Sequence, residues 1–125
     1  AGGAAGVHLG PDDVAPDRAR RIAPRGFMIG ASVGTAAEAT RGAAADYWGI
    51  GPFRVTATKD DAGAALGLDA SRPLLAMAGS RPCVAIGGVL PGDVAVLRSV
   101  GFAGVAVVSG ILAAEDVSTA ATKYR

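Results

Sequence analysis

The side chains best suited to chemistry lie in a long polar loop between two apolar stretches, within residues 46–67. After Gly51-Pro52, this loop carries two hydroxyls and one ammonium close together, those of Thr56, Thr58 and Lys59. Such a set can bind a phosphate and polar ring substituents, and long loops in compact domains commonly carry function. The same side chains also occur in solvated loops, where threonine bonds its own backbone. The residue types alone leave both interpretations open.

Glycine and serine residues close three of the apolar stretches. Gly87-Gly88 and Ser109-Gly110 end the last two predicted strands. Glycine lets a ligand approach the backbone there, and outward N–H groups near helix starts attract anions. We therefore expect a phosphate or another anion to bind at Gly88 and Ser109. Ser32 ends an earlier stretch, where it could donate to a diphosphate or begin the turn that follows.

Two titratable residues lie near the start of the chain. Asp13 follows a predicted strand, and a carboxylate there could hold Mg²⁺ together with phosphate oxygens and water. The alternative, which spacing alone favours, is that Asp12 or Asp13 caps the next helix. His8 is the one histidine and lies in the middle of a predicted strand. We expect it to be a packed, hydrogen-bonded core residue and assign it no role.

Alternating apolar and helical patterns predict the elements that must position these residues. The predicted strands are 7–9, 27–32, 47–50, 83–86 and 105–108. The predicted helices cover about 16–23, 36–45, 73–78, 91–101 and 115–124, with Thr35 and Asp69 as caps of the second and third. Strands separated by helices predict successive right-handed βαβ units and a parallel sheet. An open doubly wound sheet and a TIM barrel share this pattern, but the glycine endings at 87–88 and 109–110 favour the barrel. The dinucleotide fingerprint G-x-G-x-x-G does not follow the first strand.

Composition narrows the class of protein. The chain has 125 residues, half of them apolar, which is enough for one domain with a core. A formal net charge of +1 and scattered basic residues predict no nucleic-acid partner. No apolar run is long enough to span a bilayer, so we expect no membrane partner. The single cysteine, Cys83, fits a reduced, cytoplasmic compartment. Because the chain begins without Met, on what looks like the end of a helix, we expect it to be the later part of something longer.

The loop and the segments around it resemble the thiamine-phosphate synthase (thiamine-phosphate pyrophosphorylase) family. That family's signature loop reads Gly-Pro, a short apolar spacer, Thr-x-Thr-Lys and a downstream Gly, as residues 51–63 do here. The resemblance extends from Gly6 to Tyr124 and includes the Gly-Val-His-x-Gly strand at the start. It implies an α/β TIM (β/α)8 barrel. Residues 1–125 would form a partial barrel domain holding strands 4 to 8, with three βα units absent from this chain.

The resemblance also implies an activity. The family joins 4-amino-5-hydroxymethyl-2-methylpyrimidine diphosphate to a thiazole phosphate, giving thiamine phosphate and pyrophosphate. It implies Mg²⁺ as cofactor with Asp13 as its ligand, which reverses the preference for a helix cap. The partners would be these small-molecule substrates, with self-association of the chain as a further possibility.

The family's site residues carry over at seven positions of this chain. Thr56 and Thr58 would contact the thiazole phosphate, and Lys59 the pyrimidine diphosphate. Lys59 and Ser32 would be the catalytic residues, and Ser32 would also contact substrate. The remaining residues would lie against the thiazole phosphate, through backbone N–H groups and one hydroxyl: Gly88, Val108 and Ser109.

The departures from the family pattern keep two rivals open. An aromatic residue and Pro usually precede the first loop threonine, where this chain has Arg54 and Val55, and a downstream Asn is Asp93. Arg54 could add charge near the diphosphate or point to solvent, and we expect it to point to solvent. The related thiazole tautomerases tend to have a histidine where this chain has Gly34, which favours the synthase. The family's Gln-Leu-Arg-x-Lys and Asn-Asp motifs are not in this chain. A tautomerase-like isomerase and a non-catalytic phosphate-binding module are therefore the alternatives, and this chain alone is expected to lack synthase activity.

Overall fold

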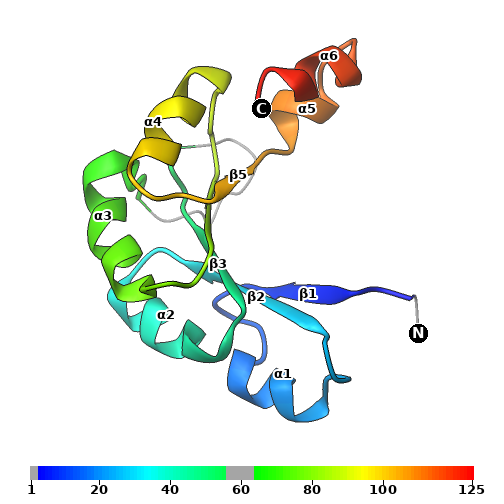
Figure 1. Cartoon of the computed structure of the whole chain (residues 1–125), viewed down its shortest axis with the longest axis vertical. Coiled ribbons are helices and arrows are strands. Elements are labelled where there is room, and N and C mark those ends of the chain that lie inside the picture. Colours follow the sequence, from blue (N-terminus) through cyan, green and yellow to red (C-terminus); the bar gives the residue numbers. More distant parts are fainter. Residues whose placement is uncertain (1–2, 56–63) are drawn as a thin grey trace.

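A computed structural model describes residues 3–55 and 64–125 of the chain, which form one parallel sheet flanked by helices (Figure 1). The strands are β1 (Gly6–Leu9), β2 (Met28–Val33), β3 (Tyr47–Ile50), β4 (Cys83–Ile86) and β5 (Gly104–Ala106). They pair in the order β1-β2-β3-β4-β5, every pair parallel. A doubly wound sheet reverses its strand order at a switch point. The sheet described here has no such reversal, so that alternative is wrong for these residues.

Helices connect the strands. They are α1 (Pro16–Ile22), α2 (Ala36–Arg41), η1 (Gly42–Ala44), α3 (Gly67–Ala78), η2 (Pro91–Asp93), α4 (Val94–Ser99), α5 (Ser109–Leu112) and α6 (Val117–Thr122). In Figure 1, α1 to α4 follow one another along one side of the curved sheet, while α5 and α6 pack together beyond the end of β5. Within residues 3–55 and 64–125, no helix is long and apolar enough to cross a membrane.

The hydrophobic core lies between one face of the sheet and these helices. Successive side chains of a strand point to opposite faces, and the alternate residues of β2 to β4 are buried. The buried apolar side chains of these three strands are those of Ile29, Ala31, Val33, Trp48, Ile50, Cys83 and Ala85. They pack with helix residues such as Ala39, Leu74 and Leu97. The opposite face is less covered in this chain, and Met28 on it is 55% exposed. The helices therefore stabilise one face and leave the other accessible.

Strand predictions were most accurate where short apolar runs end at Gly or Pro. Strands 47–50 and 83–86 are confirmed without change. The last strand was predicted too long, because β5 ends at Ala106 and Val108 is instead the residue before α5.

The predicted helix caps were correct in part. Thr35 caps α2 as expected by accepting from the Glu38 N–H at 3.2 Å. Asp69 does not cap α3, which begins earlier, after Leu66. The helix at 115–124 is shorter than predicted. Its cap is Asp116, which accepts from the Thr119 N–H at 3.0 Å.

Candidate functional site

The turn after β4 has a backbone that only glycine adopts readily. Gly87 and Gly88 have φ angles of 85° and 67°, in the left-handed region. A Cβ on Gly87 would lie 2.9 Å from Pro52 Cα, so the chain after β3 passes directly over this turn. A Cβ on Gly51 would meet the Ile86 carbonyl oxygen at less than 3.0 Å. Because Gly51 and Gly87 have no Cβ, the ends of β3 and β4 can lie in close backbone contact.

Hydrogen bonds join these two strand ends. The Phe53 N–H donates to the Ile86 carbonyl at 2.9 Å, and the Arg54 N–H donates to the Gly87 carbonyl at 2.9 Å. Neither Phe53 nor Arg54 belongs to a strand, so these two hydrogen bonds extend the β3–β4 contact beyond the sheet. Phe53 and Arg54, which precede the candidate threonines and lysine in the chain, are therefore held against the end of β4.

The second predicted anion segment, at Ser109, lies beside the first. Ser109 is exposed and is the first residue of α5, while Val108 before it is 59% exposed. The Tyr124 hydroxyl donates to the Val89 carbonyl at 3.4 Å. The same hydroxyl occupies the space that a Cβ on Gly110 would need. Tyr124 thus joins the β4 turn to the start of α5, and both exposed backbone segments face the same end of the sheet.

Ser32 belongs to a hydrogen-bonded group on the less covered face. The Ser32 hydroxyl lies 3.0 Å from His8 Nε2, and the Tyr47 hydroxyl lies 2.9 Å from His8 Nδ1. The three side chains come from β2, β1 and β3. The expectation that His8 is a packed core residue is wrong, because His8 is exposed here, although it is hydrogen-bonded as predicted. Sequence analysis did not predict the contacts of His8 with Ser32 and Tyr47, since strand pairing brings together residues that are far apart in the chain.

Asp13 is exposed and bonds its own turn. Its Oδ2 atom accepts from the Gly10 N–H at 2.7 Å. The residue before α1 is Ala15, which makes no side-chain cap, so the alternative of a helix cap is wrong. In the part of the chain that the structure describes, no group of three or more His, Cys, Asp or Glu side chains could hold a metal ion. The assignment of Asp13 as a Mg²⁺ ligand stays a prediction.

The expectation that Arg54 points to solvent is wrong. Its guanidinium binds the Asp93 carboxylate with both terminal nitrogens, Nη2 to Oδ1 at 2.7 Å and Nη1 to Oδ2. The hydrogen bond from Arg54 lowers the pKa of the Asp93 carboxyl, and the same bond raises the pKa of Arg54; burial opposes both shifts. Arg54 and Asp93 are two of the departures from the family pattern. The structure shows that they contact each other.

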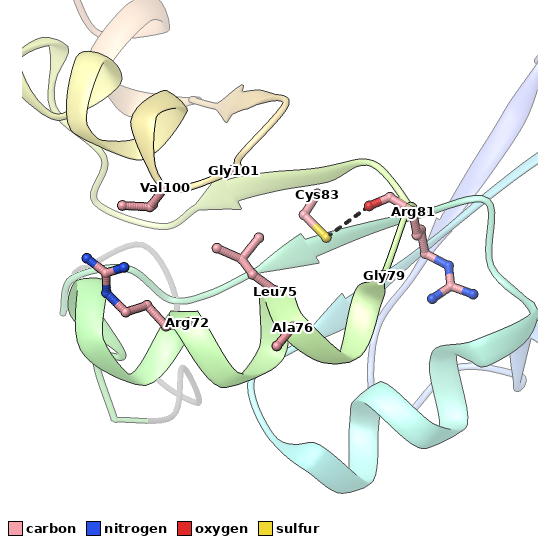
Figure 2. A pocket seen from close by; sticks show the side chains of 8 residues that line it. All are labelled: Arg72, Leu75, Ala76, Gly79, Arg81, Cys83, Val100 and Gly101. Atoms are coloured by element: carbon pink, nitrogen blue, oxygen red, sulfur yellow. Dashed lines mark hydrogen bonds between the residues drawn. The ribbon is translucent and has the colours of Figure 1, made fainter.

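Thr56, Thr58 and Lys59 lie outside the described residues, and their roles stay predictions. A cavity of about 360 Å³ lies elsewhere, at the opposite end of β4 (Figure 2). Its two guanidinium groups, on Arg72 and Arg81, point in different directions in Figure 2. Arg81 donates to the carbonyls of Ala43 and Ala45 at 2.7 and 2.9 Å, so it already has partners. We therefore assign the cavity no ligand.

The fold and this geometry define an α/β protein with its polar groups and glycine turns at the carboxyl ends of parallel strands, where such proteins bind ligands. The family model described as thiamine monophosphate synthase matches residues 1–111. The chain belongs to that family.

Curated relatives agree with this assignment. The chain is 49% identical over 127 residues to the thiamine-phosphate synthase of Methanoculleus marisnigri, covering 100% of this chain and 60% of the relative. It is 45% identical over 125 residues to that of Methanoregula boonei, covering 98% of this chain and 57% of the relative. The chain thus spans about 60% of the length of these relatives.

Solved structures show the same relationship. The thiamine phosphate pyrophosphorylase of Pyrococcus furiosus matches with a TM-score of 0.80 and 36% identity, over 97% of this chain and 57% of that one. The structure of a 3-hexulose-6-phosphate synthase matches with a TM-score of 0.61 and 18% identity, over 98% of this chain and 61% of that one. At that identity the second likeness shows the fold alone, which is TIM-barrel-like.

Proposed function

We propose that this chain supplies the thiazole-phosphate part of a thiamine-phosphate synthase site. The whole enzyme would transfer the pyrimidine group of a pyrimidine diphosphate to a thiazole phosphate, releasing pyrophosphate. The observation that carries the proposal is the left-handed Gly87-Gly88 turn joined through Tyr124 to the start of α5, in a chain of this family. Backbone N–H groups suit a phosphate because they donate at every pH at which the protein is folded.

The proposal includes a partial TIM barrel. Consecutive parallel strands with helices along one side are the arrangement of successive βα units in such a barrel. We assign β1 to β5 to barrel strands 4 to 8. The site at the ends of β4 and β5 then corresponds to the loops after strands seven and eight, where TIM barrels usually bind phosphate.

In this proposal the site residues divide the two substrates. Gly88, Val108 and Ser109 bind the thiazole phosphate through backbone N–H groups and the serine hydroxyl, with Thr56 and Thr58 beside it. Lys59 binds the pyrimidine diphosphate and stabilises the charge that develops as it leaves, while Ser32 contacts the same substrate. His8 holds the Ser32 hydroxyl in one orientation and is itself held by the Tyr47 hydroxyl, which the distances of 3.0 Å from His8 to Ser32 and 2.9 Å from His8 to Tyr47 support.

Asp13 fits Mg²⁺ as a single ligand. Mg²⁺ is usually held by one or two carboxylates together with substrate phosphates and waters. One carboxylate oxygen of Asp13 accepts from Gly10, which orients the group, and the exposed position leaves the other oxygen accessible. When bound, Mg²⁺ would neutralise diphosphate charge. A cytoplasmic location and self-association through the edges of β1 and β5 complete the proposal.

The phosphate site can be tested by titration. Ser109→Ala should weaken binding of a thiazole phosphate to this chain at least tenfold, since a hydrogen bond to a charged group contributes about 1.5–3 kcal/mol. Ser80→Ala is the matched control, because Ser80 lies at the other end of β4 and should leave affinity unchanged. Absence of binding by the parent, or equal binding by both variants, would refute the site.

Turnover tests whether this chain holds only part of the synthase site. Both substrates with Mg²⁺ should give no normal synthase turnover with this chain, because the predicted diphosphate motifs are not in it. Turnover at the rate of a complete synthase would show that the assignment of only part of the site is wrong.

A further inference from the structure

Arg54 contacts the turn after β4 through both its side chain and its backbone. Besides binding Asp93, its Nη1 atom donates to the Gly88 carbonyl at 3.1 Å, and its backbone N–H donates to the Gly87 carbonyl at 2.9 Å. Its guanidinium also lies over the Phe53 ring, 5.0 Å from the centroid. Arg54 therefore holds two successive carbonyl groups of the glycine turn.

Asp93 holds the other side of the same turn. Its Oδ2 atom accepts from the Leu90 N–H at 2.7 Å. The Asp93 side chain is 14% exposed, whereas that of Arg54 is 43% exposed. The carboxylate is thus the more enclosed partner, and the guanidinium is its charged neighbour. Together the two side chains bracket residues 87–90.

These contacts fix where the backbone donors of the turn point. In a trans peptide unit, the N–H points away from the carbonyl of the same unit. Because the Gly87 and Gly88 carbonyls face Arg54, the N–H groups of Gly88 and Val89 face away from it. Within residues 3–55 and 64–125, neither N–H donates a hydrogen bond to another backbone group. Among the described residues, Gly88 is exposed, so its N–H can face an external acceptor, whereas Val89 is only 4% exposed.

The ion pair also sets the charge beside these donors. An unpaired carboxylate at residue 93 would repel an anion bound at the turn, and this repulsion is strong where water is partly excluded. The guanidinium cancels that charge while it orients the carbonyls. The pairing of the two side chains thus serves the geometry and the electrostatics of one turn.

We propose that Arg54 and Asp93 are a positioning pair that keeps the Gly87-Gly88 turn competent to bind an anion. The inference rests on the proposed phosphate site and names the residues that prepare it. Neither side chain needs to touch the ligand. The Arg54 side chain acts through the Gly88 carbonyl, and Asp93 acts through the Leu90 N–H.

A four-protein cycle tests the pair, with sulfate as the probe because its charge is constant near neutral pH. The proteins are the parent chain, Arg54→Ala, Asp93→Asn and the double variant. Sulfate is titrated at constant ionic strength while the backbone amide signals of Gly88 and Val89 are followed by NMR. Arg98→Ala is the matched control, since it removes the same charge from an exposed site on α4.

We expect Arg54→Ala to weaken sulfate binding about tenfold and Arg98→Ala to change it less than twofold. Adding Asp93→Asn to Arg54→Ala should recover part of the loss, because the repelling charge is gone but the side-chain hydrogen bond to the Gly88 carbonyl is still missing. Complete recovery would show that the pair only cancels charge, which would overturn its positioning role. Arg54→Lys replaces Arg54→Ala in the cycle if Arg54→Ala does not fold. It keeps a charge but loses the two-pronged contact, so we expect an intermediate loss of sulfate affinity.

The outcomes separate this inference from the proposed function. A parent chain that binds no sulfate at Gly88 and Val89 would overturn the phosphate site and the pair together. A parent that binds, with Arg54→Ala and Arg54→Lys binding equally well, would overturn the pair and leave the site. Equal losses in Arg54→Ala and Arg98→Ala, with no rescue by Asp93→Asn, would also overturn it.

Discussion

Gly51→Ala should disrupt the contact between the ends of β3 and β4 on which the candidate site depends. The added methyl group would lie less than 3.0 Å from the Ile86 carbonyl oxygen and 3.1 Å from its carbon. Both are backbone atoms, and the oxygen already accepts from the Phe53 N–H at 2.9 Å. Since β4 is anchored by the core residues Cys83 and Ala85, the segment after β3 must move.

The magnitude follows from two losses. Overpacking of a closely packed site costs about 1–3 kcal/mol. Moving the segment also breaks the hydrogen bonds from Phe53 and Arg54, each contributing about 1 kcal/mol. We therefore expect the free energy of unfolding to fall by about 3–5 kcal/mol. A loss of that size is a large part of the total stability of a domain.

Urea unfolding followed by tryptophan fluorescence measures this loss. Trp48 is the chain's one tryptophan and is 2% exposed, so its emission reports on the core. Gly104→Ala in β5 is the matched control, because its Cβ would have no neighbour within 4 Å. It should change stability by less than about 1 kcal/mol. Equal shifts of the two midpoints would refute the close-contact argument.

Three further outcomes are expected elsewhere in the molecule. Tyr124→Phe should weaken sulfate binding at the β4 turn about threefold. The variant removes the hydrogen bond from Tyr124 to the Val89 carbonyl, which contributes roughly 0.5–1.5 kcal/mol. The hydrogen bond from Arg20, together with that from the Ile29 N–H, lowers the pKa of Asp46. This carboxylate therefore stabilises the fold above its unfolded pKa of about 3.9, and the contribution is lost as pH falls through the folded pKa. Thermal melting between pH 6 and about 3 should show a smaller loss of stability on acidification in Arg20→Ala than in the parent. Burial raises the pKa of the Cys83 thiol, so a thiol reagent at neutral pH should modify it only after unfolding, and rapid reaction of the folded chain would contradict that.

Sequence analysis located the strands well because their apolar runs are bounded by residues that end strands. It placed the last strand too far along, since an apolar run does not show where pairing stops. β5 pairs with β4 only as far as Ala106, opposite Ile86, and Ile86 is the last residue of β4. The end of β5 is therefore set by its partner Ile86, twenty residues earlier in the chain.

The contacts of Arg54 and His8 could not be derived from local patterns. Arg54 and its partner Asp93 are 39 residues apart, and so are His8 and Tyr47. Solvent is a common environment for an arginine in a polar loop, which is why that prediction was wrong. One signal was present in the sequence. Two departures from the same family pattern carry opposite charges, and opposite charges in neighbouring strand-end loops are candidates for a pair.

The proposed site uses different donors in its two parts. Around β1 to β3, the polar groups are side chains, with His8 joining Ser32 and Tyr47 across three strands. Around β4 and α5, they are backbone N–H groups presented by left-handed glycines and a short helix start. In the proposed site, backbone donors would bind the thiazole phosphate, whereas the Ser32 hydroxyl held by His8 would donate to the diphosphate as charge develops on it. This division matches the proposed reaction, because the thiazole phosphate keeps its charge throughout and the diphosphate gains charge as it leaves.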